Sequence, residues 1–216
     1  MKKLFLITLF PFSCFSSPFI GADYLYTYNN HDYNVQYHQD NIKLSPDKSD
    51  SGFTLYGGFT FDENWEFELG YQKYELGYQK YELDSSIEGN RSINNNVISN
   101  YEWDSKINVD RFYLMPKYIY SINDDIDFRI GAGLTYTDYK FSTSKSEEFE
   151  SLINADNEWT TPISSHSFSK KRLGIISKFE LNYKLPYNFS INTSALLHDD
   201  SVLSSLSLTL GARYSF

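Results

Sequence analysis

The sequence predicts an all-β fold, an eight-stranded antiparallel transmembrane β-barrel with short periplasmic turns and three long extracellular loops. Three observations lead to this prediction. Apolar and polar residues alternate along eight segments with a period of two, which is the period of a β-strand. Short and long connections alternate between these segments. After the first residues, no apolar run approaches the roughly 18 residues that a membrane helix needs.

The N-terminus has the pattern of a secretory signal peptide. In "MKKLFLITLFPFSCFSS", two lysines precede a short apolar run, and small residues follow it. The spacing of these small residues suits cleavage after Ser16, so we expect a signal peptide at 1–16 and a barrel domain at 17–216. Cleavage after Ser17 would leave Pro18 directly behind the cut. The single cysteine lies in the signal peptide, so no disulfide is expected in the mature chain.

The first three predicted strands cover 18–28, 52–61 and 65–81. The first, "FIGADYLYTY", alternates weakly, and the second, "GFTLYGGFTF", has its phenylalanine and leucine side chains on one face. The third follows the tight turn "DEN", which starts its apolar series at Trp65 and places Glu66 on the opposite face.

The third strand contains the tandem repeat "ELGYQKYELGYQKYEL" at 68–83. Two heptads that each carry a glycine are too few for a coiled coil. A tilted strand crosses the membrane in about 9–11 residues, so this crossing ends near 73–75. On a strand, a seven-residue step moves Glu75, Gly77 and Gln79 to the face that had been apolar. Water accepts these residues there, so we expect a raised hairpin above the membrane, formed with the start of the fourth strand.

The fourth and fifth predicted strands, 106–120 and 126–141, flank the turn "INDD". The fifth, "IDFRIGAGLTYTDY", alternates clearly. The fourth, "INVDRFYLMPKYIY", is ambiguous, and we assign its faces as follows. Phe112, Leu114, Tyr118 and Tyr120 are expected to face outward, and Arg111, Tyr113 and Lys117 inward.

The last three predicted strands cover 171–185, 188–198 and 202–216. A tight turn at "PY" separates the first two, and a short connection follows the second. In "SSLSLTLGARYSF", one face is apolar and ends in aromatic residues, and the other carries small, mostly hydroxyl-bearing residues. The expected extracellular loops, all polar, lie at 29–51, 82–105 and 142–170.

The polar faces of the predicted strands carry several charged residues. A secreted sandwich or a lipocalin-like barrel would point charge outward, whereas a barrel in lipid must enclose it. Eight strands leave an interior that side chains just fill, and buried charges must pair because their desolvation is costly. We therefore expect an ion-pair network that plugs the lumen; the alternative is a narrow gated pore. The expected network comprises Glu66, Glu68, Arg111, Lys117, Asp127, Arg129, Lys178, Glu180 and Arg213.

The composition limits the partners. The formal charge is −9 and the pI is about 4.9, which disfavours nucleic acid because a phosphate backbone attracts a basic face. The predicted loops at 82–105 and 142–170 are both acidic. Polyanions such as heparin are therefore poor ligands for them.

The C-terminal strand resembles the sorting signal of Gram-negative outer-membrane proteins. A final aromatic residue follows apolar residues at alternating positions. The resemblance implies recognition by the barrel-assembly machinery. The residues that carry it are Leu208, Leu210, Ala212, Tyr214 and Phe216.

Other segments resemble small OmpA-like and OmpX/Ail-like barrels. "PKYIYSINDDIDFRIGAGLTY" (116–136) is similar to their strand–turn–strand unit, and "PFIGADYLYTY" and "GFTLYGGFTF" look like their first two strands. The resemblance implies an eight-stranded barrel in the Gram-negative outer membrane, in contact with lipid and lipopolysaccharide. Some members, including Ail-like and accessory-colonisation-factor-like proteins, act in adhesion or survival in a host. The acidic loops of this chain depart from the Ail-like pattern.

Four histidines are the candidates for catalysis or metal binding. "SSHS" surrounds His166 and "HDD" starts at His198, and a lipid-A-modifying enzyme would need such serine, histidine and acidic groups. His31 and His38 lie in "NNHDYNVQYHQD", which could bind a metal. Scattered histidines in polar loops are usually solvated, and no calcium-loop spacing occurs. We therefore expect no enzyme activity, no cofactor and no metal.

The predicted function is that of a non-enzymatic outer-membrane barrel whose loops contact other surfaces in adhesion, colonisation or resistance to host defences. The reason is that much of the chain lies in the three long predicted loops, whereas eight strands enclose only a narrow lumen. A host surface or matrix ligand is the partner that this function requires. The alternatives are a structural or narrow-pore barrel and, third, a lipid-A-modifying enzyme.

Overall fold

Eight strands close into a ring. The computed structural model describes residues 17–76, 81–84, 97–151 and 158–216, so the predicted signal peptide lies outside the described residues. The strands pair antiparallel in the order β5–β4–β1–β11–β10–β9–β8–β7, and β5 pairs back onto β7. This closure leaves no free edge within the membrane and confirms the predicted barrel. The ring strands are β1 (Ser17–Asn30), β4 (Ser49–Thr60), β5 (Trp65–Leu76), β7 (Val97–Ser121), β8 (Ile126–Ser151), β9 (Glu158–Lys184), β10 (Phe189–Asp199) and β11 (Ser204–Ser215).

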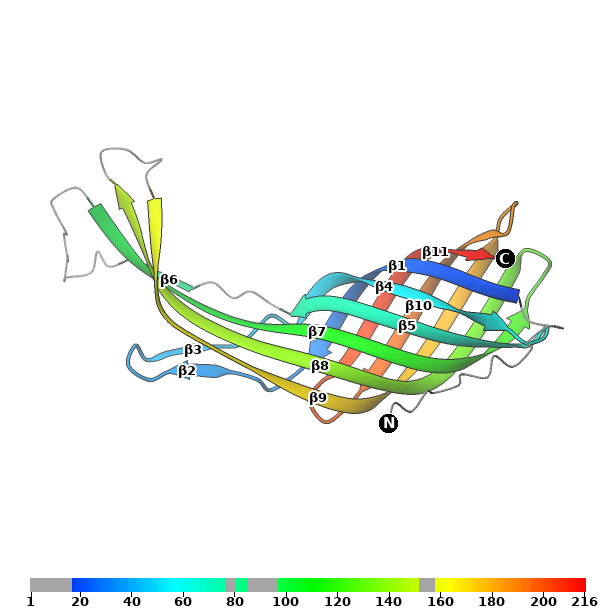
Figure 1. Ribbon diagram of the computed structural model, residues 1–216, viewed down its shortest axis with the longest axis horizontal. Coiled ribbons are helices and arrows are strands. Elements are labelled where there is room, and N and C mark those ends of the chain that lie inside the picture. Colours follow the sequence, from blue (N-terminus) through cyan, green and yellow to red (C-terminus); the bar gives the residue numbers. More distant parts are fainter. Residues whose placement is uncertain (1–16, 77–80, 85–96, 152–157) are drawn as a thin grey trace, which may run out of the picture.

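Three tight turns gather at the end of the barrel where the C-terminus lies (Figure 1). Asp62 accepts two backbone hydrogen bonds across the β4–β5 turn, and Asn123 does the same between β7 and β8. Between β9 and β10, Tyr187 and Asn188 have φ values of 62° and 64°. Two successive residues of this kind match the right-handed twist of a hairpin. These turns form the predicted periplasmic end.

The outer face of the ring is apolar. Leu208 is 58% exposed, and Leu210, Ala212 and Phe216 face outward with it, whereas Tyr214 is half-buried. The faces predicted for 106–120 are confirmed. Phe112, Leu114, Tyr118 and Tyr120 are exposed, and Arg111, Tyr113 and Lys117 are buried.

Aromatic side chains form contacts at two levels of the outer face. Near the periplasmic turns, the ring centroids of Trp65 and Tyr118 lie 5.2 Å apart. Further along the same two strands, those of Tyr71 and Phe112 lie 4.9 Å apart. Aliphatic residues lie between the two levels, including the strand partners Leu69 and Leu114. Such aromatic belts around an apolar band are typical of barrels that contact lipid.

Strands β7, β8 and β9 extend far beyond the ring as a twisted sheet (Figure 1). The predicted strand ends fell short here, because much of 82–105 and 142–170 is strand rather than irregular loop. The β7–β8 pairing continues as far as Val97 opposite Ser151. Neither face of this extension continues the lipid-facing series of the barrel, so alternation does not reveal it in the sequence.

Three short strands complete the extracellular side. β2 (Val35–Tyr37) and β3 (Ile42–Leu44) form a hairpin in the first loop, and β6 (Tyr81–Asp84) pairs with β7. Above β5, which ends with Leu76 opposite Ile107, β6 extends the same sheet with Tyr81 opposite Trp103. This agrees with the raised hairpin that the repeat predicted, although 77–80 lie outside the described residues. In the described part of the chain, no helix is both long and apolar enough to cross a membrane.

Candidate functional site

Lys117 lies at the centre of the lumen, in contact with three carboxylates. Its Nζ is 2.7 Å from Glu66 Oε1, 2.5 Å from Glu68 Oε2 and 3.2 Å from Glu180 Oε2. All four side chains are buried. Two inward positions of β5 supply the first two carboxylates, and ring closure brings β7 and β9 within reach of them. One ammonium group thus offsets charge from two other strands.

Three further cations surround this centre. Lys178 Nζ lies 2.8 Å from Glu180 Oε2, and Arg129 Nη1 lies 3.1 Å from Oε1 of the same residue. On the other side, Arg213 Nη1 lies 2.8 Å from Glu66 Oε2. Glu66, Glu68 and Glu180 therefore each have more than one cationic partner, which is the condition under which buried charge is tolerated.

The structure brings eight of the nine predicted lumen residues together. Asp127 joins through Arg129 Nη2, which lies 3.3 Å from its Oδ2. Arg111 is the exception. It donates to Gln72 Oε1 at 3.2 Å and to Tyr74 Oη at 2.9 Å, and no described carboxylate lies within ion-pair distance. The expected ion pair of Arg111 is therefore wrong for the described residues, because the inward neighbours at its level are neutral.

Two further polar residues face the same lumen and were not singled out from the sequence. Asp23 Oδ2 lies 3.9 Å from Lys178 Nζ, and the Tyr56 ring centroid lies 4.8 Å from the same nitrogen. The weak period-two pattern of "FIGADYLYTY" already placed Asp23 opposite its apolar neighbours. Because the alternation in that strand is weak, the inward position of Asp23 was not recognised from the sequence.

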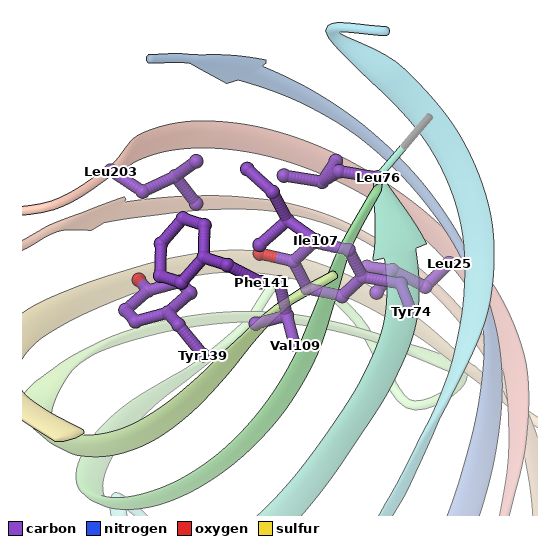
Figure 2. Close-up of a cluster of buried hydrophobic side chains, with 8 residues drawn as sticks. All are labelled: Leu25, Tyr74, Leu76, Ile107, Val109, Tyr139, Phe141 and Leu203. Atoms are coloured by element: carbon purple, nitrogen blue, oxygen red, sulfur yellow. The ribbon is translucent and has the colours of Figure 1, made fainter. Parts of the chain in front are cut away.

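An apolar layer lies above the charged network, toward the extracellular mouth. Its side chains point inward from β1, β5, β7, β8 and the β10–β11 turn, and they pack against one another (Figure 2). We expected a polar lumen throughout, so this layer is a departure from the prediction. Packed apolar side chains exclude water, so they separate the ion pairs from the extracellular medium. The layer comprises Leu25, Tyr74, Leu76, Ile107, Val109, Tyr139, Phe141 and Leu203.

The β2–β3 hairpin packs against the extracellular sheet. Ile42 and Leu44 form a buried cluster with Trp103 of β7. The single hydroxyl proton of Tyr37 is shared between the backbone oxygens of Asp104, at 3.1 Å, and Ser144, at 3.0 Å. The first loop therefore braces the sheet at the point where it leaves the barrel.

An ion pair holds the tip of this hairpin. Lys145 Nζ lies 2.8 Å from both carboxylate oxygens of Asp40, and the indole of Trp103 donates to Asp40 Oδ2 at 3.1 Å. The same ammonium group lies 5.1 Å from the Tyr101 ring centroid and 5.2 Å from that of Trp103. The hydrogen bond from Lys145 holds the pKa of Asp40 below its usual value. We call Asp40, Lys145, Trp103 and Tyr101 together the Asp40 clasp.

Charge is divided along the extracellular sheet. Glutamates gather toward its far end, whereas the basic residues nearer the barrel lie at the level of Asp110 and Asp138. The far end therefore presents negative charge to a partner. The far-end glutamates are Glu102, Glu147, Glu148, Glu150 and Glu158, and the basic residues nearer the barrel include Lys106, Lys140, Lys170, Lys171 and Arg172.

Residues 15–216 match the model of the outer membrane protein beta-barrel domain family. The chain belongs to this family. Family membership places the barrel in the outer membrane of a Gram-negative cell, with its apolar outer face against lipid. No curated protein matches the sequence.

Two solved outer-membrane barrels illustrate the shared fold. Ail of Yersinia pestis, in complex with the heparin analogue sucrose octasulfate, is 16% identical with a TM-score of 0.51, over 94% of this chain and 100% of Ail. OprG from Pseudomonas aeruginosa is 12% identical with a TM-score of 0.53, over 93% of this chain and 96% of OprG. At these identities the likeness concerns the fold alone.

The histidine candidates have different surroundings from those of a catalytic set. His198 Nε2 lies 3.1 Å from Thr135 Oγ1 and 3.7 Å from Asp200 Oδ2, so hydroxyl and acid meet the same ring nitrogen. A serine-type triad needs them on opposite nitrogens. His166 lies on the extended part of β9, above the lipid-facing wall. Among the described residues, no three histidine, cysteine or acidic side chains gather to hold a metal.

Proposed function

We propose that this member of the outer membrane protein beta-barrel domain family is non-enzymatic and uses its extracellular sheet to contact other surfaces, in adhesion, colonisation or resistance to host defences. The observation that carries the proposal is the continuation of β7, β8 and β9 past the barrel, braced by the β2–β3 hairpin. A braced sheet loses little conformational freedom when it binds. A long irregular loop would lose more.

The charge of the sheet indicates the kind of partner. The far end carries acidic residues on both β8 and β9, so we expect a host or matrix surface that is basic there. The solved complex of Ail contains a heparin analogue, which is a polyanion. The acidic far end disfavours such a ligand in this chain.

A protein that acts at the cell surface must be exported and assembled into the outer membrane. We infer that residues 1–16 are a signal peptide removed after Ser16, and that the alternating series ending in Phe216 is recognised by the barrel-assembly machinery. The outward direction of Leu208, Leu210 and Ala212 supports the second inference, because these side chains share the lipid-facing side of β11. Lipopolysaccharide is the expected neighbour of the outer face.

We propose that the lumen network is structural. Its carboxylates and cations pair closely, and the apolar layer lies between them and the extracellular medium. The narrow-pore alternative predicts steady single-channel conductance from the purified barrel. Conductance that is abolished by Arg129→Ala would favour that alternative.

Truncation of the extracellular sheet tests the surface-contact function. Ser142 pairs with both Lys106 and Ser167, so short turns that replace 77–105 and 143–166 leave the ring strands intact. We expect the truncated barrel to keep heat-modifiable migration and outer-membrane location but to lose cell attachment and serum survival. Full attachment and survival by the truncated barrel would contradict the proposal. The control is Asp124→Ala in a periplasmic turn, which should leave attachment and serum survival unchanged.

A further inference from the structure

A cavity of about 470 Å³ opens at the extracellular mouth of the barrel. Its walls come from four separate parts of the chain: the start of the first loop at 30–33, β8, β9 and the β10–β11 turn. It lies on the extracellular side of the apolar layer, and Phe141 and Leu203 belong to both. The volume falls within the usual range for small-molecule sites.

One wall of the cavity is an aromatic platform. The rings of Phe141 and Phe168, strand partners on β8 and β9, are stacked with centroids 4.7 Å apart and planes 11° from parallel. Tyr33 adds a third ring, with its centroid 4.6 Å from that of Phe141. Phe168 is 45% exposed although it is part of this stack. A large apolar ring face is therefore available to a ligand.

Polar side chains without a partner among the described residues lie beside the platform. His31 lines the cavity and is only 7% exposed, yet neither of its ring nitrogens has a hydrogen-bond partner among the described residues. Buried polar atoms of this kind are rare unless a ligand or water satisfies them. Lys170 and Asp32 also line the cavity and form no ion pair within the described chain. The rim thus offers both donors and acceptors.

The aromatic platform and the polar groups of the rim together favour some classes of ligand over others. A quaternary ammonium group needs several rings around it, but Phe141 and Phe168 are stacked on each other and leave no space for it between their faces. A phosphate group would meet one lysine and the carboxylates of Asp32 and Asp200. A sugar ring has an apolar C–H face that can lie on the platform, and hydroxyls that both donate and accept.

We propose that this cavity binds a single pyranose ring of a glycan. The proposal goes beyond the surface-contact function, because the cavity lies at the mouth of the barrel and truncation of 77–105 and 143–166 leaves its lining in place. Pyranose rings occur in the cell's own lipopolysaccharide and in glycans of other surfaces, and both present the same chemistry. The C–H face packs on Phe168, and the hydroxyls reach His31, Lys170 and Asp32.

Calorimetric titration of the full-length mature barrel in a detergent without a sugar headgroup tests the proposal. The titrants are methyl hexopyranosides, N-acetylhexosamine and a uronic acid, with choline and inorganic phosphate as the competing classes. Core oligosaccharide released from lipopolysaccharide and a soluble host-type glycan form two further arms, which distinguish the sources. We expect at least one pyranoside to bind, and choline and phosphate not to bind.

Two matched variants locate the site. Phe168→Ala removes the exposed ring of the platform and is expected to weaken pyranoside binding by about three- to tenfold. Trp159→Ala is the control, because Trp159 forms the other stacked pair of the same hairpin, with Phe149, and does not line the cavity. It should bind as the unaltered protein does. His31→Asn, which keeps a donor and an acceptor, should weaken binding less than His31→Leu.

Three outcomes would overturn the inference: no pyranoside binds, choline or phosphate binds instead, or Trp159→Ala weakens binding as much as Phe168→Ala. Cell attachment by the same variants separates this inference from the surface-contact function. If pyranosides fail to bind while truncation of the sheet still abolishes attachment, only the inference about the cavity is wrong. If truncation leaves attachment intact, the surface-contact function itself is wrong.

Discussion

The ring of Tyr113 occupies the space beside Gly70, its strand partner on β5. A Cβ atom added at Gly70 would lie 2.1 Å from Tyr113 Cζ. Tyr56 lies beside Gly21 in the same way, with the corresponding distance 2.2 Å. The hydroxyl of Tyr113 then donates to Glu68 Oε1 at 2.7 Å. Each glycine thus leaves room for a tyrosine that fills the lumen, and one of these tyrosines joins the ion-pair network.

Gly70→Ala is predicted to destabilise the barrel, because the new methyl group and the Tyr113 ring cannot occupy the same space. Overpacking of this kind costs roughly 1–3 kcal/mol. The urea midpoint of unfolding, followed by heat-modifiable migration, should fall. At Gly57, where an added Cβ has 3.2 Å to its nearest neighbour, alanine should shift the midpoint much less. Equal midpoints for the two variants would show that the tyrosine is not held in this space.

Lys117→Met is predicted to be the most damaging lumen substitution, because it removes the common partner of three buried carboxylates. The loss of one partner from a buried ion pair costs roughly 3–5 kcal/mol. Arg111→Met is the matched control, since Arg111 is also buried but binds neutral groups. The measurement for both variants is the yield of protein that refolds into lipid vesicles. Arg111→Met should refold much better, and the reverse order would contradict the assigned network.

Leu208→Lys is predicted to impair insertion, because it places a charge on the lipid-facing surface. A lysine there costs about 2–4 kcal/mol near the bilayer midplane. Thr161→Lys is the control, since Thr161 is exposed on the extension of β9. The amount of each protein in the outer-membrane fraction is the measurement. Normal insertion of Leu208→Lys would show that this face does not meet lipid.

Acid is predicted to release the β2–β3 hairpin. Because the pKa of Asp40 is lowered in the folded protein, the clasp is fully stabilising above the carboxyl's unfolded pKa, near 3.8. Its contribution is lost as the pH falls through the lower, folded pKa. Spin labels at Lys43 and Thr161 report the distance between hairpin and sheet. That distance should stay constant from pH 7 to about pH 4 and increase below this range.

Asp40→Asn provides the comparison for this acid transition. The amide is neutral, so the label distance in this variant should not change through the same acidic range. A transition that persists unchanged in Asp40→Asn would assign it to other carboxylates. A transition near neutral pH would contradict the lowered pKa.

The direction of most charged and lipid-facing side chains in the membrane could be predicted from the sequence, whereas the inward direction of the apolar layer could not. Lipid and lumen are such different surroundings that Phe112 and Arg111, one residue apart, must point in opposite directions. The extended sheet could not be predicted in this way. Around Glu147 and Thr161, which are strand partners, both faces meet water, so alternation carries no signal.

The sequence by itself determined the strand count, the closed barrel and the inward direction of its charges, because a period of two in lipid permits only one arrangement. Only the tertiary structure decided which charges meet. Lys117, Glu68 and Glu180 come from three strands far apart in the chain, and ring closure and register set their distances. The same holds for the apolar layer and for the cavity above it, since neighbours across a lumen leave no periodic trace along a single strand.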